Sequence, residues 1–234
     1  MTAPLVLSEV FGPTVQGEGP SMGRRCMFVR LGGCNLSCRW CDTPYTWDWR
    51  GLTGTAYDPK KELHRTDVAD VARAVVEADV TLLVVSGGEP LLQQRGLADL
   101  FAVLPAGLDI EIETNGTRAP TPEITDAVTH FNVSPKLMHS GDPLRRRIIA
   151  AGLVGLRDSG KAVWKFVASR PADLSEIKVI VDSLGLYPVY VMPLGTDRES
   201  TGARLSEMAE AIIANGWNIT TRLHVDIWGE RRGV

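Results

Sequence analysis

The sequence of 234 residues is 44% hydrophobic and 23% charged, which is enough apolar chain to bury the core of a single globular domain, 1–234, and excludes a disordered protein. Its formal net charge of −3 provides no excess of basic residues, so we expect no nucleic-acid partner. No run approaches the roughly 18 apolar residues of a membrane span, and the first residues lack the pattern of a signal peptide, so we expect a cytoplasmic protein without a membrane partner.

The first elements are a strand and a glycine-rich loop. Residues 5–11 alternate weakly between apolar and polar side chains and predict a short strand, and glycines and prolines mark residues 12–20 as a loop. Gln16 and Glu18 lie between glycines that let the backbone approach a ligand closely. Their side chains could hydrogen-bond a flat heterocycle, although the spacing alone favours a solvated turn.

An apolar run at 26–31 predicts the next strand. Cys26 opens this run, so its side chain is expected in the core rather than at a metal. Arg30 stands at the end of the strand, either as a surface charge or as a fork for a carboxylate, and the planar guanidinium geometry suits the carboxylate.

Three of the four cysteines, Cys34, Cys38 and Cys41, follow in the loop 32–43 with the spacing CxxxCxxC. A structural zinc site normally closes with four protein ligands, whereas three thiolates on one loop suit a cubane iron–sulfur cluster that leaves one iron open to an outside ligand. The alternatives are a zinc knob with Cys26 as its fourth ligand, or plain thiols near a turn. Cysteines so few and so local do not make a disulfide framework.

Residues 45–65 show no clear periodicity and predict an irregular crossover over this loop. Trp47 and Trp49 in this crossover could shield a cluster from solvent or simply pack the segment down. A helical repeat of apolar residues then predicts a helix over 66–78, with Thr66 as its N-cap.

From residue 80 the sequence alternates between strand and helix patterns. Strands are predicted at 80–86, 108–114, 130–134, 162–168 and 188–192, and helices at 91–104, from Pro122, and at 143–151, 172–184 and 203–215. Such alternation indicates a parallel sheet with right-handed crossovers. Counting 26–31 there are six strands, short of the eight that close a TIM barrel, so we predict an α/β fold, a partial (β/α)6 TIM-like barrel open on one side.

The carboxyl ends of parallel strands meet at one edge, so the polar residues there should face one mouth. These are Arg30, 86–89, 113–115, 134–136, Lys165 and 192–195. Glu113 shares one side of its strand with Glu111 and could accept two N–H bonds from an amidine-like edge of a heterocycle. It could equally form an ion pair with Lys136 or Lys165.

The C-terminal part, 218–234, is predicted as a strand followed by a basic tail. His224 would lie on that strand, where a lone histidine usually has a structural role.

Two motifs together resemble the radical S-adenosylmethionine (SAM) superfamily: the CxxxCxxC loop, and Gly-Gly-Glu-Pro at 87–90 after a buried strand. Further stretches, which span nearly the whole chain, are similar to the 7-carboxy-7-deazaguanine synthase (QueE) family. They are Phe-Gly-Pro-Thr-Val-Gln-Gly-Glu-Gly at 11–19, Phe-Val-Arg-Leu-Gly-Gly-Cys at 28–34, Trp-Cys-Asp-Thr at 40–43, Glu-Thr-Asn-Gly at 113–116, Ser-Pro-Lys at 134–136, and the terminal Leu-His and Gly-Val.

This resemblance implies a radical rearrangement of 6-carboxy-5,6,7,8-tetrahydropterin to 7-carboxy-7-deazaguanine with loss of ammonia, a carbon–nitrogen lyase reaction on the route to queuosine and other deazapurines. It implies a [4Fe–4S] cluster, SAM and Mg²⁺ as cofactors. It also implies a homodimer and an electron donor such as flavodoxin or ferredoxin.

Carried over position by position, the resemblance assigns three groups of residues. Substrate would be bound by Val15, Gln16, Gly17, Glu18, Arg30, Ser86, Glu113 and His224. SAM would be bound by Trp40, Cys41, Asp42, Gly88, Glu89, Asn115, Ser134, Pro135 and Lys136. Cys34, Cys38 and Cys41 would hold the cluster and Thr43 the Mg²⁺. Ser86 stands where threonine is commoner in the family, which keeps the hydroxyl.

Two other classes share parts of this pattern. A glycyl-radical-enzyme activating enzyme also has CxxxCxxC and a small partial barrel, but it would need a groove for a protein partner. A zinc-stabilised binding module would use the cysteines without any redox chemistry.

Overall fold

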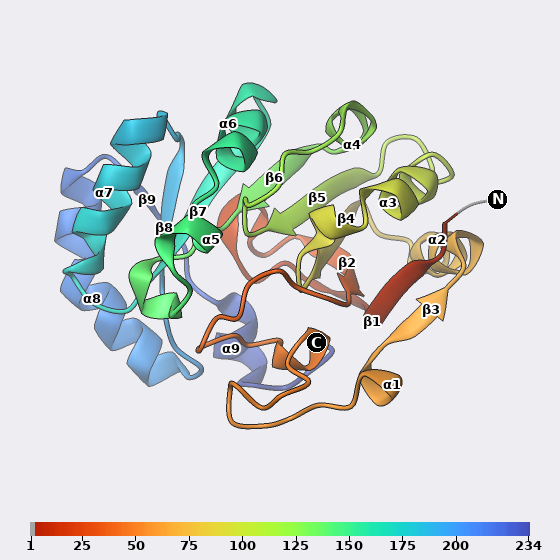
Figure 1. Ribbon diagram of the computed structural model, residues 1–234, viewed down its shortest axis with the longest axis horizontal. Coiled ribbons are helices and arrows are strands. Elements are labelled where there is room, and N and C mark those ends of the chain that lie inside the picture. The colour runs from red at the N-terminus through yellow and green to blue at the C-terminus, as the bar shows by residue number, and fades with distance from the viewer. Residues whose placement is uncertain (1–2) are drawn as a thin grey trace.

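The computed structural model describes residues 3–234, in which nine strands form one open sheet with the order β3-β1-β2-β4-β5-β6-β7-β8-β9 (Figure 1). The strands are β1 (Leu5–Val15), β2 (Arg25–Leu31), β3 (His64–Thr66), β4 (Leu82–Gly87), β5 (Asp109–Thr114), β6 (His130–Val133), β7 (Ala162–Ala168), β8 (Val189–Pro193) and β9 (Asn218–Ile219). The helices are α1 (Pro59–Glu62), α2 (Val68–Glu77), α3 (Gln94–Phe101), α4 (Pro122–Ala127), α5 (Leu144–Arg147), α6 (Ala150–Asp158), α7 (Asp173–Leu184), α8 (Arg198–Ala214) and α9 (Leu223–Trp228).

The six predicted strands of the partial barrel are confirmed as neighbours. β2, β4, β5, β6, β7 and β8 run parallel in this order. β1 adds to β2 in the antiparallel direction, and the two-residue β9 extends the far edge. The sheet does not close, as the strand count predicts.

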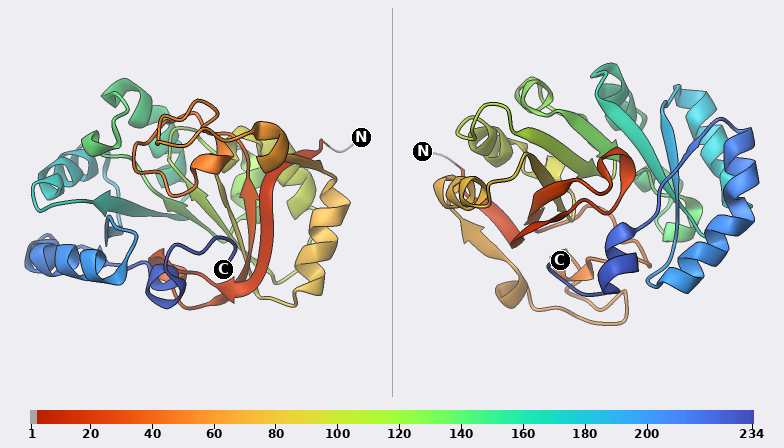
Figure 2. Two further views of the ribbon diagram at one scale, coloured as in Figure 1. Left: turned by 90° about the horizontal axis from the view of Figure 1, so that it is seen from below. Right: turned by 180° about the vertical axis from the view of Figure 1, so that it is seen from behind.

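The two faces of the sheet differ in what covers them. Helices α2, α3, α4, α6, α7 and α8 lie along its outer, convex side, while α9 and the C-terminus lie on the inner side (Figures 1 and 2). Strand alternation sends Leu83 and Val85 into the large outer core, and Leu82 and Val84 into a small inner cluster with Cys26 and Phe28. The helical layer therefore takes most of the apolar surface and leaves the inner side for polar groups.

Strand β1 is longer than predicted and runs through the first part of the expected loop 12–20. A register shift between Phe11 and Thr14 absorbs Gly12 and Pro13, which is the usual place for proline in a sheet because it lacks an N–H. Gly12 has φ +134°, and a Cβ there would lie 3.0 Å from the Cα of Met27, so this bulge requires glycine.

The helix predicted at 143–151 is wrong, because the chain forms α5 and then α6. Glycines near residue 152 look like a helix end, but Gly152 and Gly155 lie inside α6. A Cβ on Gly152 would lie 2.5 Å from the carbonyl oxygen of Gly116, so this glycine lets the helix approach the loop after β5. Helix α8 begins five residues earlier than predicted, where the Asp197 side chain accepts a bond from the Ser200 N–H at 2.8 Å.

The helix predicted over 66–78 begins at Val68, and its N-cap is Asp67 rather than Thr66, which belongs to β3. The other corrections concern the two least periodic segments. The crossover 45–65 is not wholly irregular, since it contains a 3₁₀ turn (Pro44–Thr46), α1 and the start of β3. The C-terminal strand is wrong beyond Ile219, because the chain turns and forms α9. Among residues 3–234 no helix has the length and apolar character needed to cross a membrane.

Candidate active site

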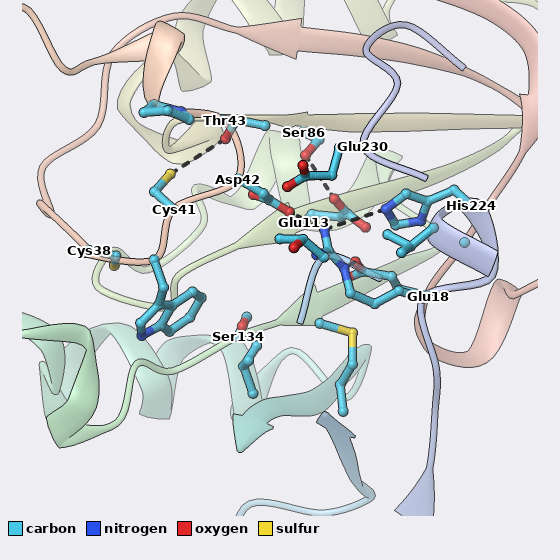
Figure 3. Close-up of a pocket in the computed structure, with 18 of the residues that line it drawn as sticks. Glu18, Cys38, Cys41, Asp42, Thr43, Ser86, Glu113, Ser134, His224 and Glu230 are labelled. Carbon is cyan, nitrogen blue, oxygen red and sulfur yellow. Dashed lines mark hydrogen bonds and ion pairs between the residues drawn. The ribbon is translucent and has the colours of Figure 1, made fainter. Parts of the chain in front are cut away.

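A cavity of about 900 Å³ lies at the carboxyl ends of the parallel strands (Figure 3). Each of the six strands, or the residue directly after it, contributes a lining side chain: Arg30, Ser86, Glu113, Ser134, Lys165 and Met192. Strand register places Arg30 directly beside Ser86 across β2 and β4. The single mouth predicted from the sequence is confirmed.

The cluster loop 32–43 forms one wall of the cavity, and the glycines after β4 hold it there. Gly88 N–H donates to the carbonyl of Leu31 at 3.0 Å, and Glu89 N–H donates to the carbonyl of Gly33 at 2.8 Å. A Cβ on Gly88 would lie only 2.0 Å from the Gly33 oxygen. The Gly-Gly pair is therefore needed for the two backbones to touch, and this contact fixes the position of the cysteines.

The three thiols fit an iron–sulfur cluster. Cys34, Cys38 and Cys41 all line the cavity. Burial raises the pKa of Cys34 and of Cys38 to about 12 and raises that of Cys41, so a cationic centre is needed to hold them as thiolates. Within residues 3–234 no three His, Cys, Asp or Glu side chains converge as the ligands of one metal ion would, whereas a cubane binds each thiolate at a different iron.

Cys26 is not near this wall. It is fully buried in the inner cluster with Phe28, Leu82 and Val84, and burial raises the pKa of its thiol to about 12. The prediction that Cys26 is a core residue is confirmed, and a zinc site with Cys26 as fourth ligand does not fit this arrangement.

Aromatic residues of the crossover cover the third cysteine. The indole N–H of Trp47 donates to the Cys41 sulfur at 3.2 Å, and the Thr43 hydroxyl lies 3.7 Å from the same sulfur. Trp47, Tyr45 and Tyr57 line the cavity, whereas Trp49 is not among the lining residues. Trp47 thus shields the thiol, and only one of the two tryptophans considered takes this position.

Opposite the cysteines, Glu113 presents a carboxylate held by two neutral donors. The Ser86 hydroxyl donates to one Glu113 oxygen at 2.7 Å (Figure 3). The Gln16 amide donates to the other oxygen at 3.1 Å. The same Gln16 amide group donates to Glu111 at 2.7 Å, and His130 lies 2.8 Å from the other Glu111 oxygen. The expected alternative, an ion pair of Glu113 with Lys136 or Lys165, does not form.

A charged network occupies the floor of the cavity. Glu18 accepts from Lys165 and from Arg222, whose Nε lies 3.1 Å away, and Arg222 also bonds Asp42 and the Gly195 carbonyl. Burial alone would raise the pKa of Glu18, but the two cations hold it well below its ordinary value. The Glu18 loop is thus held by buried charge, and the solvated turn favoured by spacing is not formed.

Arg30 and the C-terminal tail meet at Glu9. Arg30 Nε donates to Glu9 at 2.9 Å, and the Tyr45 hydroxyl donates to the same carboxylate at 3.1 Å. Arg232 bonds Glu9 as well, lies 2.9 Å from Glu62, and places its guanidinium carbon 3.7 Å from the centre of the Tyr45 ring. These contacts hold residues 229–234 along the cavity, which they line.

His224 lies on α9 rather than on a strand, and it packs on the Gln-Gly-Glu-Gly loop. A Cβ on Gly17 would lie 2.0 Å from His224 Nδ1, and Leu223 N–H donates to the Gly17 carbonyl at 2.9 Å. Burial lowers the pKa of His224, with Glu18 opposing and Arg222 adding to the effect. Gly17 therefore leaves the space that the imidazole occupies.

All but two of the predicted site residues line the cavity. Glu89 is fully buried behind it and accepts from Thr114, from the Asn115 N–H and from the Leu91 N–H at 2.7–2.9 Å, so it braces the loops at the ends of β4 and β5. Pro135 follows β6 and is also outside the lining. Asn115 donates to Asn35 at 3.0 Å, and Lys136 donates to Ser134 at 2.9 Å.

Several lining residues went unnoticed in the sequence, and Arg222 and Glu230 are two charged examples. Both belong to the segment read as a strand and tail, where charged residues look solvent-exposed. The signal for Arg222 was its place in a run, Ile219 to Val225, that consists mainly of apolar and β-branched residues.

Comparisons with known proteins agree with this geometry. Residues 28–148 match the Radical SAM superfamily. The chain is 36% identical to 7-carboxy-7-deazaguanine synthase of Pyrobaculum aerophilum, over 96% of this chain and 95% of the relative. It is 33% identical to the enzyme of the same name from Halobacterium salinarum, over 97% and 91%. The crystal structure of QueE from Escherichia coli superposes with a TM-score of 0.69 at 25% identity, covering 94% of this chain and 95% of that one.

Proposed function

The chain belongs to the 7-carboxy-7-deazaguanine synthase family of the radical SAM superfamily, and on this premise we propose that it converts 6-carboxy-5,6,7,8-tetrahydropterin to 7-carboxy-7-deazaguanine. Ammonia is lost in this ring contraction, which makes the enzyme a carbon–nitrogen lyase. The product serves the biosynthesis of queuosine and other 7-deazapurines.

Cys34, Cys38 and Cys41 hold the cluster in this proposal, and Trp40, Asp42, Gly88, Asn115, Ser134 and Lys136 hold SAM beside it. When bound, the cluster and SAM would supply the radical chemistry, the abstraction of a hydrogen atom from the substrate. Among residues 3–234 no thiol beyond these three lines the cavity, because Cys26 lies in the core, and three thiolates suit a cluster with one iron open to SAM.

Glu113 binds the pterin by hydrogen bonds in this proposal. Its two oxygens each have one protein donor, from Ser86 and Gln16, and each keeps a further lone pair for the ligand. A carboxylate can accept paired N–H bonds from the amino-pyrimidinone edge of a pterin. Because Glu113 is fixed from both sides, it can hold that edge in one orientation.

Arg30 binds the substrate carboxylate. Its Nε is used by Glu9, and among residues 3–234 its terminal nitrogens form no hydrogen bond, so they can donate to a ligand. His224 and the buried Glu18–Arg222 pair close the floor on the opposite side. Enclosure matters because an alkyl radical abstracts hydrogen from any donor within reach.

Thr43 is the one protein ligand assigned to Mg²⁺ in this proposal. Thr43 lines the cavity and would supply one hydroxyl oxygen, and substrate and water oxygens would complete the coordination of this hard cation. Bound there, Mg²⁺ would neutralise the substrate carboxylate. We further propose a cytoplasmic homodimer that receives electrons from a carrier such as flavodoxin or ferredoxin and acts on no nucleic acid.

The observation that carries the proposal is the placement of Glu113, Gln16 and Arg30 across one cavity from the three cysteines. Anaerobically reconstituted enzyme, reduced and supplied with SAM, 6-carboxytetrahydropterin and Mg²⁺, is expected to form a product with deazapurine absorbance. Cleavage of SAM without that product would contradict the assigned substrate.

The variant Glu113→Gln tests the pterin assignment. It replaces one acceptor oxygen by an NH₂ group that faces the ligand's own donors, so kcat/KM for the pterin should fall about 10²-fold. Uncoupled SAM cleavage should stay unchanged because Glu113 is not assigned to SAM. Equal losses of both activities would instead mean that Glu113 supports the cavity as a whole.

The position of the tail opposes an activating enzyme for glycyl-radical proteins. Such an enzyme must admit a polypeptide loop, whereas residues 229–234 line this cavity and Arg232 ties them to Glu9 and Glu62. A small substrate fits this enclosure better.

A further inference from the structure

A second hollow, of about 500 Å³, lies beside the cluster loop and is lined by Asn35 of that loop. It is formed by that loop, the loop after β5, the start of α3, and helices α5 and α6. The lining residues are Asn35, Gln94, Thr117, Arg118, Ala119, Arg145, Arg146, Ile149, Ala151 and Gly152.

The hollow is strongly basic, although the chain has a net charge of −3. Arg118 and Arg145 are exposed, and within residues 3–234 their guanidinium groups make no hydrogen bond or ion pair. Arg146 donates to the carbonyl of Asn35 at 2.7 Å and stays half exposed. Arg146 also lies 3.6 Å from the Asp142 carboxylate, but no Asp or Glu of the described chain lines the hollow itself, so the charges of Arg118 and Arg145 stay uncompensated.

Only a thin wall separates the hollow from the cluster site. Asn35 lines the hollow, while its neighbour Cys34 lines the cavity. The Asn35 amide donates to Thr117 at 2.7 Å and accepts from Asn115 at 3.0 Å, and Asn115 lines the cavity. A group that binds in the hollow is thus one residue away from a cluster ligand.

Exposed apolar side chains lie on the neighbouring elements. Leu144 of α5 is 61% exposed and precedes Arg145, and Met138 of the preceding 3₁₀ turn is 65% exposed. Exposed apolar side chains beside unpaired arginines are typical of protein–protein interfaces, so this surface suits a protein partner better than a free anion.

We propose that this basic hollow docks a small acidic electron-carrier protein, which delivers the electron that the cluster requires. The inference rests on the proposed function, because only a redox cluster needs such a partner. One electron passes from the reduced cofactor of the carrier to the cluster, so the carrier is oxidised by one electron and the cluster is reduced, with no bond formed or broken. The unpaired arginines attract and orient the acidic partner.

The test uses the double variant Arg118→Glu/Arg145→Glu in the reconstituted enzyme. The second-order rate constant for cluster reduction by reduced flavodoxin, an acidic carrier, should fall at least about 10-fold at low ionic strength. Added salt should bring the rate constants of the wild type and the variant closer together. Reduction by the methyl viologen radical cation should become faster, because the charge of the hollow has been reversed. Stopped-flow absorbance of the cluster measures both rates.

The matched control is Lys60→Glu/Arg65→Glu, which changes the net charge equally at exposed positions of α1 and β3. It should leave both rates close to those of the wild type. Turnover driven by photoreduced 5-deazariboflavin, an uncharged donor, should be the same in the wild type and in both variants. If the wild type showed no turnover with this donor, the result would contradict the proposed function and would not bear on the docking proposal.

Two results would overturn the docking proposal. One is an unchanged flavodoxin rate in the Arg118/Arg145 variant. The other is an equal loss in the control variant, which would reveal only an effect of net charge. RNA binding that the variant abolishes, without any change in the flavodoxin rate, would assign the hollow to a nucleic acid instead.

Discussion

The cluster loop (32–43) and the C-terminal segment (222–234) line the same cavity, but different forces hold them there. Backbone hydrogen bonds from Gly33, Gly88 and Glu89 fix the cluster loop, and these are neutral and local to neighbouring strands. Arg222 and Arg232 hold the C-terminal segment through carboxylates that are more than 150 residues away in sequence. The first wall is therefore part of the sheet scaffold, whereas the second depends on charge and should respond to salt and pH.

The largest effect is expected in the cluster loop. Replacing Cys34, Cys38 or Cys41 by alanine should remove the bound iron and lower turnover at least about 10³-fold, because a missing ligand leaves the cluster unstable. The fold should persist, since backbone bonds hold the loop. Iron and sulfide analysis and EPR of the reduced protein measure the loss, with Cys26→Ala as a control that keeps its cluster.

The next effect concerns the buried cation of the C-terminal segment. Arg222→Met leaves Glu18 and the Gly195 carbonyl without this donor, so the free energy of unfolding should fall by about 3 kcal/mol. Urea denaturation measures it. Arg24→Met is the comparison: its ion pair with Asp109 is 40% exposed on both sides, and the loss should stay below about 1 kcal/mol. Equal losses would mean that the buried network contributes nothing beyond a surface pair.

A smaller effect follows from the pKa of His224, which burial lowers below its ordinary value of 6.5. A histidine with a lowered folded pKa contributes stability above its unfolded pKa and loses it as the pH falls through the folded value. The free energy of unfolding should therefore decline below pH 6.5, by at most about 1.4 kcal/mol per pH unit from this residue.

His224→Gln should flatten that decline, while His64→Gln, a substitution of an exposed histidine on β3, should not. Thermal or urea unfolding between pH 5 and 7.5 gives the slopes. Identical slopes in the wild type and the His224 variant would assign the pH response to Glu18 or Asp42, which share its network.

The smallest effect is at the end of the chain. Arg232→Ala removes the ties to Glu9 and Glu62, which are partly exposed, so stability should fall by no more than about 1 kcal/mol. The KM for the pterin should rise several-fold because the tail no longer covers the cavity, and high salt should weaken the wild type in the same way. Arg73→Ala, which breaks an exposed pair with Asp70 on α2, should change neither quantity.

The comparison also explains what could be predicted from the sequence. The six parallel strands and their polar ends were predicted correctly because apolar runs alternate with amphipathic helices, and because parallel strands bring Arg30, Ser86 and Glu113 to one edge. Each of these inferences uses a pattern that is contained within one segment or repeats from one to the next.

The C-terminal segment could not be predicted in this way. Leu223, Val225 and Ile227 alternate as in a strand, yet the segment is helical because Leu223 docks on the Gly17 carbonyl and Arg222 binds Glu18. Likewise, Gly152 resembles a helix end until its contact with the Gly116 carbonyl is known. Both the C-terminal helix and the glycine inside α6 depend on contacts with residues far away in the sequence, and a local sequence pattern does not contain such contacts.

The bond between Glu9 and Arg232 joins residues 223 positions apart, so one side of the cavity mouth is synthesised well before the other. The cysteines at 34–41 leave the ribosome long before residue 222 does. The loop with the three cysteines is therefore synthesised before the arginines that hold residues 222–234 along the cavity.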